Sequence, residues 1–307
     1  MQKIAVVGPG RVGESTAQIL AQQSLCRELV LLGTRESVAR GIALDIQESA
    51  PLFGFDTRIG GGADPALLSG AELVIITAGQ PRKPGMSRDD LRDANLAVVR
   101  SVVENVLRYA PQAMVLMVTN PVDVLTYATW RQTGWPRRRI LGLSGVLDSA
   151  RMASFVAQAS GYSVRDITAM VVGGHGDAMV PLPEYTCING IPIKHLLDPA
   201  TIARLIEHTR RGGAEILALK QTSSAYDSPA AAITAMVEAM IRDRKRILPC
   251  VAILDGEYGQ RDIAMGVPVI LGKAGMEKVL ELPLTADESR ALLRSGEAVR
   301  AGLSGLP

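Results

Sequence analysis

The sequence predicts a doubly wound α/β domain with a parallel sheet, followed by a second domain of mixed α+β structure. Short apolar runs alternate with longer helical patterns as far as about residue 145. These runs are apolar throughout, which is typical of parallel strands that helices cover on both faces. The alternation ends after Asp148, so we expect one domain over residues 1–145 and a second over residues 146–307.

Strands and helices alternate in the first domain. The apolar runs that we expect to be strands are Ile4–Val7, Leu29–Leu32, Leu73–Thr77, Met114–Thr119 and Ile140–Leu143. Apolar residues recur at helical spacing across Leu91–Tyr109. Asp64-Pro65 predicts a helix start, because Asp caps free N–H groups and Pro is tolerated in the first turn. This order of elements is that of a doubly wound sheet.

The second domain mixes both kinds of element without a regular alternation. We expect helices over Ala150–Ala159, Pro199–Leu219, Pro229–Arg242 and Thr285–Ala301, and strands over Ile167–Val172, Val251–Leu254 and Val267–Leu271. Val180–Ile193 is Pro-rich, and its Asn189-Gly190 pair predicts a tight turn.

Composition excludes several classes of function. The chain has 307 residues with 33 Lys+Arg against 31 Asp+Glu, so its net charge of +2 gives no reason to expect a nucleic-acid partner. No run reaches ~18 uncharged apolar residues, so we expect no membrane span, and Lys3–Val7 looks like a buried strand rather than a leader. Three widely spaced cysteines predict no disulfide framework and a reducing, cytoplasmic location.

A glycine-rich loop follows the first expected strand. Gly8-Pro9-Gly10-Arg11-Val12-Gly13 fits the pattern G-x-G-x-x-G between a strand and a helix. Its glycines permit a tight turn, close approach of a pyrophosphate and close packing of helix on strand, while the helix N-terminus offers N–H donors. We therefore expect a dinucleotide site.

The second strand lacks the acid that usually binds the adenosine ribose. At the expected position the chain has Gly33-Thr34-Arg35. Without a carboxylate, nothing repels a ribose 2′-phosphate, and Thr34 and Arg35 offer groups that bind phosphate. This favours NADP over NAD; the alternative is an NAD site that tolerates glycine, with Arg35 solvated beside Glu36.

Candidate catalytic residues lie in three segments. His175 stands in the glycine-flanked segment Val172–Asp177, and Asp148 and Arg151 are three residues apart, which places them on one face if the segment is helical. A basic loop, Gln80–Asp90, follows the third expected strand and is well placed to close over a ligand. His195 and His208 have no comparable neighbours in the sequence.

The ordered motifs resemble the lactate/malate dehydrogenase family, and within it the lactate-dehydrogenase-like malate dehydrogenases. The resemblance covers essentially the whole chain, and its motifs are Gly8–Gly13, Thr77–Gly79, Arg82–Arg88, Val118–Asp123, Leu147–Arg151, Gly174–Asp177 and Met179–Leu182. It implies an N-terminal Rossmann dinucleotide-binding domain, a C-terminal substrate-binding domain, and a homodimer or homotetramer with an interface near Ile42–Glu48.

The resemblance implies a role for each candidate. His175 would exchange a proton with the oxygen on substrate C2, and Asp148 would orient its ring and favour the imidazolium. Arg151 would bind the C1 carboxylate, Arg88 would polarise the carbonyl, and Asn120 would orient substrate and nicotinamide. The residues expected to contact the coenzyme are Gly8, Gly10, Arg11, Val12, Gly13, Gly33, Thr34, Arg35, Thr77, Ala78, Gly79, Asn95, Val118 and Asn120.

Arg82 indicates the substrate. The family typically has Gln at this loop position in lactate enzymes and Arg in malate enzymes. A second substrate carboxylate needs a cation, whereas Arg facing a methyl group would be left unpaired at a cost of ~2–5 kcal/mol. We therefore expect malate and oxaloacetate as substrates in place of lactate and pyruvate.

Rival functions remain at this point. The nearest is a lactate or broad 2-hydroxyacid dehydrogenase, against which Arg82 argues. An NAD- and metal-dependent glycosidase would need a Cys/His ligand set that the sequence does not offer, and we expect no metal site. A nucleotide-sensing protein would not require His175, Asp148 and three arginines in this order. Asp227 departs from the aromatic or small residue that relatives often carry, and its role stays open.

Overall fold

The structure is a computed structural model that describes residues 1–81, 88–221, 223–304 and 306. Arg82, on which the substrate prediction depends, lies outside the described residues, as does the side chain of Arg88. Within the described part of the chain, no helix combines the length and apolar character needed to cross a membrane.

The N-terminal half forms a six-stranded parallel sheet. Its strands are β1 (Lys3–Val7), β2 (Glu28–Leu32), β3 (Arg58–Gly62), β4 (Leu73–Ile76), β5 (Met114–Met117) and β6 (Ile140–Gly142), in the order β3-β2-β1-β4-β5-β6. This order is that of a doubly wound Rossmann sheet. The sequence did not reveal β3, because three of its five residues are glycine and it has no apolar run.

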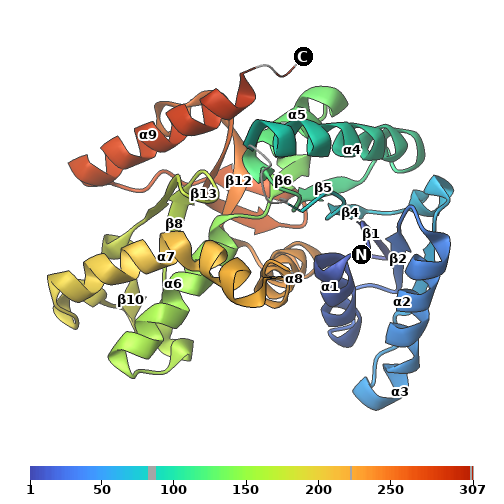
Figure 1. Cartoon of the computed structure of the whole chain (residues 1–307), viewed down its shortest axis with the longest axis horizontal. Helices are drawn as coiled ribbons and strands as arrows, with labels where there is room; N and C mark the ends of the chain where they lie inside the picture. The colour runs from blue at the N-terminus through green and yellow to red at the C-terminus, as the bar shows by residue number, and fades with distance from the viewer. Residues whose placement is uncertain (82–87, 222, 305, 307) are drawn as a thin grey trace.

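Helices cover both faces of this sheet (Figure 1). They are α1 (Arg11–Gln22), α2 (Glu36–Glu48), α4 (Arg88–Tyr109) and α5 (Val122–Thr133). The short α3 (Ala50–Phe53) follows α2 and has no buried residue. On β1, Ile4 and Val6 pack with α1 and α2, whereas Ala5 and Val7 pack with α4 and α5. Burial on both faces explains why the strands are apolar throughout.

The C-terminal half is mixed, as predicted. Its helices are α6 (Gly145–Ser160), α7 (Pro199–Lys220), α8 (Asp227–Ile241) and α9 (Ala286–Leu303). Its strands are β7 (Ile167–Thr168), β8 (Val171–Gly173), β9 (Met179–Pro181), β10 (Cys187–Ile188), β11 (Ile191–Pro192), β12 (Arg246–Asp255), β13 (Arg261–Gly272) and β14 (Gly275–Val279). Short 3-10 helices occupy Pro65–Leu68, Arg137–Arg139, Val164–Asp166, Pro183–Tyr185, Ile193–His195 and Glu257–Gly259.

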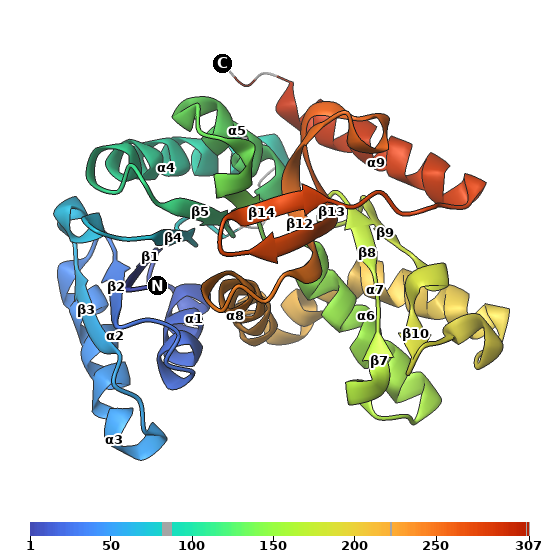
Figure 2. The ribbon, with the colours of Figure 1, turned by 180° about the vertical axis from the view of Figure 1, so that it is seen from behind.

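One sheet runs through both halves of the chain. β12 pairs antiparallel with β6 at Val251 and Gly142, and the path continues through β13, β8 and β9 (Figure 2). β12 and β13 form a hairpin longer than the two runs predicted for it. The segment predicted as one strand over Ile167–Val172 is two short strands in different sheets, β7 and β8.

Two predicted local signals have different outcomes. Asn189-Gly190 forms the turn between β10 and β11, and both residues have positive φ as a tight hairpin requires. The Asp64 side chain accepts the Ala66 N–H as predicted, but the segment continues only as a four-residue 3-10 helix. Asp64 therefore caps a helix start, but the residues that follow have no amphipathic pattern that would favour a longer helix.

The parallel strands place four loops at one edge of the sheet. The carboxyl ends of β1, β2, β4 and β5 meet there, as the strand pairing requires. α6 begins directly after β6, and α8 lies beside α1 in both views (Figures 1 and 2). The C-terminal half is thereby packed against the edge at which open α/β sheets bind ligands.

Candidate active site

The glycine loop after β1 has one open glycine between two crowded ones. A Cβ added at Gly8 would lie 2.4 Å from the Ala78 nitrogen, and one at Gly13 would lie 2.3 Å from the Gly8 carbonyl oxygen. A Cβ at Gly10 would meet no heavy atom within 4 Å, and no side chain caps the start of α1. The free helix end and the open backbone at Gly10 are suited to a pyrophosphate.

Gly33 at the end of β2 is in contact with the glycine loop. A Cβ at Gly33 would lie 2.7 Å from Cγ and 2.8 Å from Cδ of Pro9. An acidic side chain could not occupy this position without a shift of the Pro9 ring. Packing against Pro9 is thus a second physical reason for the glycine. Thr34 and Arg35 are exposed next to it.

The loops after β1, β4 and β5 are held together by side-chain hydrogen bonds. Thr77 Oγ1 donates to the Gly8 carbonyl oxygen at 2.7 Å, and Thr119 Oγ1 donates to that of Ala78 at 2.7 Å. Asn95 is buried; its Nδ2 donates to the Asn120 carbonyl oxygen at 2.8 Å, and its Oδ1 accepts the Gln80 N–H at 2.7 Å. Asn95 therefore braces the loop, while Asn120 is exposed at the edge.

His175, Asp148 and Arg151 lie in direct contact. His175 Nδ1 is 2.8 Å from Asp148 Oδ2, and the Arg151 guanidinium is 3.0 Å from Asp148 Oδ1. Asp148 is buried in the first turn of α6, whereas His175 and Arg151 are partly accessible. Since Nδ1 is engaged, Nε2 is the ring nitrogen available for a substrate.

The surroundings of the His175 ring favour its charged form. Burial lowers the pKa of His175, but the Asp148 carboxylate and the Asp123 carboxylate raise it, so the net shift is upward from the ordinary value of 6.5. Arg151 opposes this shift weakly. The ring is therefore prepared to donate a proton near neutral pH.

Asp123 is a close neighbour that we did not predict as a site residue. Its Oδ2 accepts the backbone N–H of His175 at 2.8 Å, and its side chain is buried at the start of α5. Burial raises the pKa of Asp123 to about 6, although the His175 N–H lowers it. The sequence signal was the acid three residues after Asn120, which is indistinguishable from a helix-start acid without the fold.

Gly173, Gly174 and Gly212 make room for side chains of neighbouring helices rather than for a ligand. A Cβ at Gly173 would lie 2.6 Å from Ser295 Oγ of α9, which accepts the Gly174 N–H at 2.8 Å. These glycines therefore allow α9 to approach. On α7, a Cβ at Gly212 would lie 2.3 Å from Cδ of Arg151, so this glycine makes room for the arginine side chain.

The other histidines, the cysteines and Asp227 lie outside this cluster. His208 pairs with Glu215 at 2.7 Å and stacks on Phe155, and His195 is exposed. Asp227 is an exposed residue at the start of α8 that lies 3.9 Å from Lys220. The three cysteines are free, and burial raises the pKa of the Cys26 thiol to about 12.

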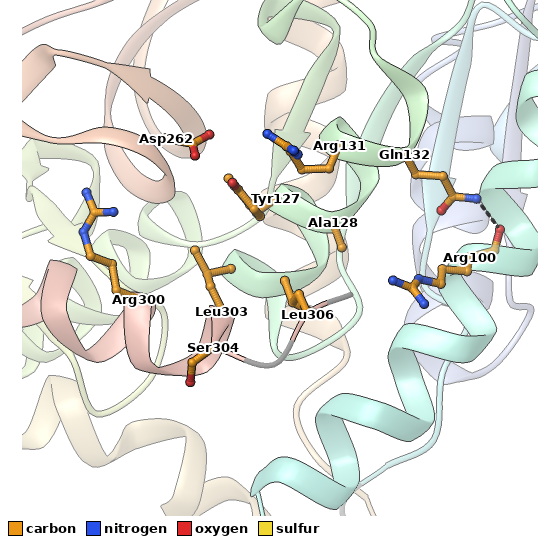
Figure 3. Close-up of a pocket in the computed structure, with 10 residues that line it drawn as sticks. All are labelled: Arg100, Tyr127, Ala128, Arg131, Gln132, Asp262, Arg300, Leu303, Ser304 and Leu306. Carbon is orange, nitrogen blue, oxygen red and sulfur yellow. Dashed lines mark hydrogen bonds between the residues drawn. The ribbon is translucent and has the colours of Figure 1, made fainter.

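A large hollow in the surface is separate from this cluster (Figure 3). It has a volume of about 850 Å³ and lies between α4, α5, β13 and α9, and its lining includes Arg100, Arg131, Arg300, Asp262 and Tyr127. Its lining includes none of the predicted site residues. Across the described ranges, no group of three or more His, Cys, Asp or Glu residues could hold a metal ion.

Comparison with known families matches both halves of the chain. Residues 2–142 match the family model for the lactate/malate dehydrogenase NAD binding domain. Residues 145–304 match the model for the lactate/malate dehydrogenase alpha/beta C-terminal domain.

Known proteins resemble the chain over its full length. A malate dehydrogenase of Thioalkalivibrio sulfidiphilus is 63% identical over 306 residues, which covers 100% of both chains. The structure of a malate dehydrogenase from Salinibacter ruber superposes with a TM-score of 0.94 at 42% identity, covering 98% of this chain and 96% of that one. The structure of a lactate dehydrogenase of Cryptosporidium parvum, in complex with lactic acid and NAD, has a TM-score of 0.95 at 38% identity and covers 100% and 99%. The fold alone therefore does not distinguish the two substrates.

Proposed function

The chain belongs to the lactate/malate dehydrogenase family, and we propose that it catalyses the reversible reduction of oxaloacetate to malate with a nicotinamide dinucleotide. The observation that carries this proposal is the buried Asp148 carboxylate in contact with both His175 and Arg151. One side of this carboxylate prepares a proton donor, and the other orients a cation that suits a substrate carboxylate.

Proton transfer is assigned to His175. In reduction, Nε2 gives its proton to the oxygen on C2 while Asp148 holds Nδ1–H and stabilises the charged ring beforehand. In oxidation, neutral Nε2 takes the hydroxyl proton. A positioned acid or base of this kind contributes about 10²–10⁴-fold to the rate.

Substrate binding is assigned to arginines and an amide. Arg151 retains N–H groups beyond the one directed at Asp148, and these bind the C1 carboxylate. Asn120 stands at the sheet edge, where it donates to the substrate oxygen. From the sequence alone, we assign Arg88 to polarise the carbonyl and Arg82 to bind the second carboxylate.

The coenzyme site fits a dinucleotide. The open backbone at Gly10 and the uncapped start of α1 would hold the pyrophosphate, with Arg11 exposed beside them. A bound nicotinamide dinucleotide would supply or accept the hydride that C2 of the substrate gains or loses.

We infer a preference for NADP over NAD. Support comes from the exposed hydroxyl of Thr34 and guanidinium of Arg35, which follow β2 where an acid would otherwise repel a 2′-phosphate. Comparison of kcat/KM for NADPH and NADH tests this preference, and a clear preference for NADH would contradict it.

We further propose that the protein is a homodimer or homotetramer and that it is located in the cytoplasm. We also propose that the boundary between its two domains lies near residue 145. Three large apolar side chains on α2 and α3 are exposed, namely Leu44 at 60%, Leu52 at 87% and Phe53 at 55%. They extend the face near Ile42–Glu48 and suit contact with a second copy. The free cysteines fit a reducing compartment.

A matched pair of histidine variants tests the assigned chemistry. We expect His175→Gln to lower kcat for oxaloacetate reduction by about 10²-fold or more, because it removes the proton donor. His195→Gln makes the same chemical change at an exposed position and should retain wild-type kcat. Equal kcat values for both variants, measured from absorbance of the reduced coenzyme, would contradict the role of His175.

A further inference from the structure

Asp123 is a buried carboxylate that the assigned chemistry does not use. Asp123 is 6% exposed, and its Oδ2 accepts the backbone N–H of His175 at 2.8 Å. Among the described residues, Oδ1 has no hydrogen-bond partner although it is buried. Burying a carboxylate with half of its acceptor capacity unused is costly, so a purely structural position would favour a neutral side chain.

The position of Asp123 connects two parts of the site. It lies in the first turn of α5, three residues after Asn120, while its partner His175 lies in the loop between β8 and β9. The hydrogen bond therefore joins the substrate-facing edge of the N-terminal half to the loop that carries the proton donor. The N-terminal end of α5 also favours a negative charge there.

Asp123 and Asp148 act on His175 from two different elements. Asp148 of α6 contacts Nδ1, whereas Asp123 of α5 contacts the backbone. The charged groups facing the pair are Asp148 and Arg151 of α6: the Asp148 carboxylate raises the pKa of both Asp123 and His175, and Arg151 lowers that of His175. Each carboxylate is thus an electrostatic partner of the imidazolium.

We propose that Asp123 is a positioning residue for the proton transfer, which fixes the His175 backbone and, as an anion, favours the imidazolium that donates the proton. The inference rests on the proposed role of His175. His175 then has two carboxylate partners with separate roles. Asp148 orients the ring, and Asp123 fixes the position of the loop between β8 and β9 and adds negative charge near the ring.

The charge of Asp123 can be removed while its acceptor is kept. In Asp123→Asn, the amide oxygen can still accept the His175 N–H, but the negative charge is lost. The pKa of His175 should therefore fall, by about one unit or less, because the ring loses a nearby opposite charge. Asp123→Ser removes the same charge with a smaller side chain and should lower the pKa in the same direction.

Nuclear magnetic resonance titration measures this pKa without any turnover. The chain has only three histidines, so His175 is assigned by comparison with His175→Gln, and His195 and His208 serve as internal references. Asp177→Asn is the matched control, since Asp177 is an exposed acid in the same loop and is not among the groups that most affect the pKa of His175. We expect a lower pKa for His175 alone, and only in the Asp123 variants.

The pH profile of oxaloacetate reduction gives the functional readout. The alkaline limb of kcat/KM should move to lower pH in Asp123→Asn. At pH values above the wild-type limb, kcat/KM of the variant should be up to about tenfold lower than that of the wild type. An unchanged pKa of His175 in a folded Asp123 variant would overturn the proposal. A wild-type protein without oxaloacetate activity would instead overturn the proposed function, and the titration would still decide the role of Asp123.

Discussion

Asp148 uses its two oxygens for two different tasks. Oδ2 contacts the His175 ring and Oδ1 contacts the Arg151 guanidinium, so one buried residue connects the proton donor to the proposed carboxylate-binding group. Breaking a buried ion pair on one side leaves the remaining charges uncompensated. Replacement of Asp148 should therefore affect proton transfer and substrate binding together.

The first prediction concerns Asp148→Asn. Loss of the carboxylate removes the main influence that raises the pKa of His175, so burial then holds this pKa below its ordinary range. The protonated ring needed for reduction is available only at lower pH, and kcat near neutrality should fall about 10- to 100-fold. The pH profile of kcat/KM for oxaloacetate reduction checks this, and an alkaline limb at the wild-type position would contradict it.

Site residues could be predicted from the sequence where the chemistry requires particular residue types in a particular order along the chain. His175, Asp148 and Arg151 were predicted in this way, and the structure brings them together. Asp123 and Gly212 could not be found, because their importance lies in contacts with residues far along the chain. Arg82 stays a prediction from the sequence.

Among the elements, α7 has a particular relation to the site. Gly212 and Gly213 occupy consecutive positions within this helix, although each glycine destabilises a helix interior by about 1 kcal/mol relative to Ala. Arg151 of α6 lies across Gly212, and a Cβ there would come within 2.3 Å of its Cδ. The glycine sets how closely the arginine can lie against α7.

The second prediction is that Gly212→Ala displaces Arg151. KM for oxaloacetate should rise roughly tenfold, equivalent to about 1.4 kcal/mol, whereas KM for the coenzyme stays unchanged. Gly213→Ala is the matched control, because its Cβ would lie 3.9 Å from the Arg151 guanidinium, an ordinary contact. Steady-state kinetics of both variants check the prediction, and equal KM values for oxaloacetate would exclude this role of Gly212.

The third prediction concerns the loop between β1 and α1. Gly33→Asp alone should weaken the binding of both NADPH and NADH, because the new Cβ collides with the Pro9 ring. Pro9→Ala combined with Gly33→Asp should relieve the collision. The ratio of kcat/KM for NADH to that for NADPH should then rise tenfold or more beyond the sum of the single effects, which corresponds to a coupling free energy between the two substitutions of about 1.4 kcal/mol. The ratio of kcat/KM values in the single and double variants checks this, and purely additive effects would show that Pro9 does not restrict position 33.

Helices and strands could be predicted from the sequence where the pattern of apolar residues was strong. They were missed where contacts with distant parts of the chain form them. The apolar runs of β1, β2 and β4 and the amphipathic pattern of α4 were predicted to within a few residues. β3 is held by pairing with β2 instead of by its own apolar residues, and a Cβ at its Gly61 would lie 2.2 Å from the Ala39 carbonyl oxygen of α2. Close approach of α2 therefore explains a strand that strand propensity does not indicate.

At the scale of the whole molecule, the two halves share one sheet. Pairing of β6 with β12 joins the parallel part to the antiparallel part, and α8 packs against α1. The sequence predicted the fold class of each half, but not this continuity, because the pairing of Val251 with Gly142 joins segments more than 100 residues apart. Such long-range pairing leaves no local pattern.

The fourth prediction concerns the face formed by α2 and α3. Leu52→Glu should weaken association of copies, because a charge placed in an apolar contact must be desolvated. Leu293→Glu on α9 makes the same change at a residue that is 50% exposed and should leave the molar mass unchanged. Light scattering after size-exclusion chromatography measures both, and an unchanged assembly in Leu52→Glu would place the interface elsewhere.

The fifth prediction is the direct test of the central claim that the site reduces a dicarboxylate by proton donation from His175. The measurement is kcat/KM for oxaloacetate and for pyruvate, each with NADPH and NADH, in the wild type and in Arg82→Gln. We expect the wild type to favour oxaloacetate by roughly 10²-fold or more, and Arg82→Gln to lose activity far more with oxaloacetate than with pyruvate, because the second carboxylate loses its cation. Equal kcat/KM values for the two substrates in the wild type, or equal losses in Arg82→Gln, would contradict the proposed function.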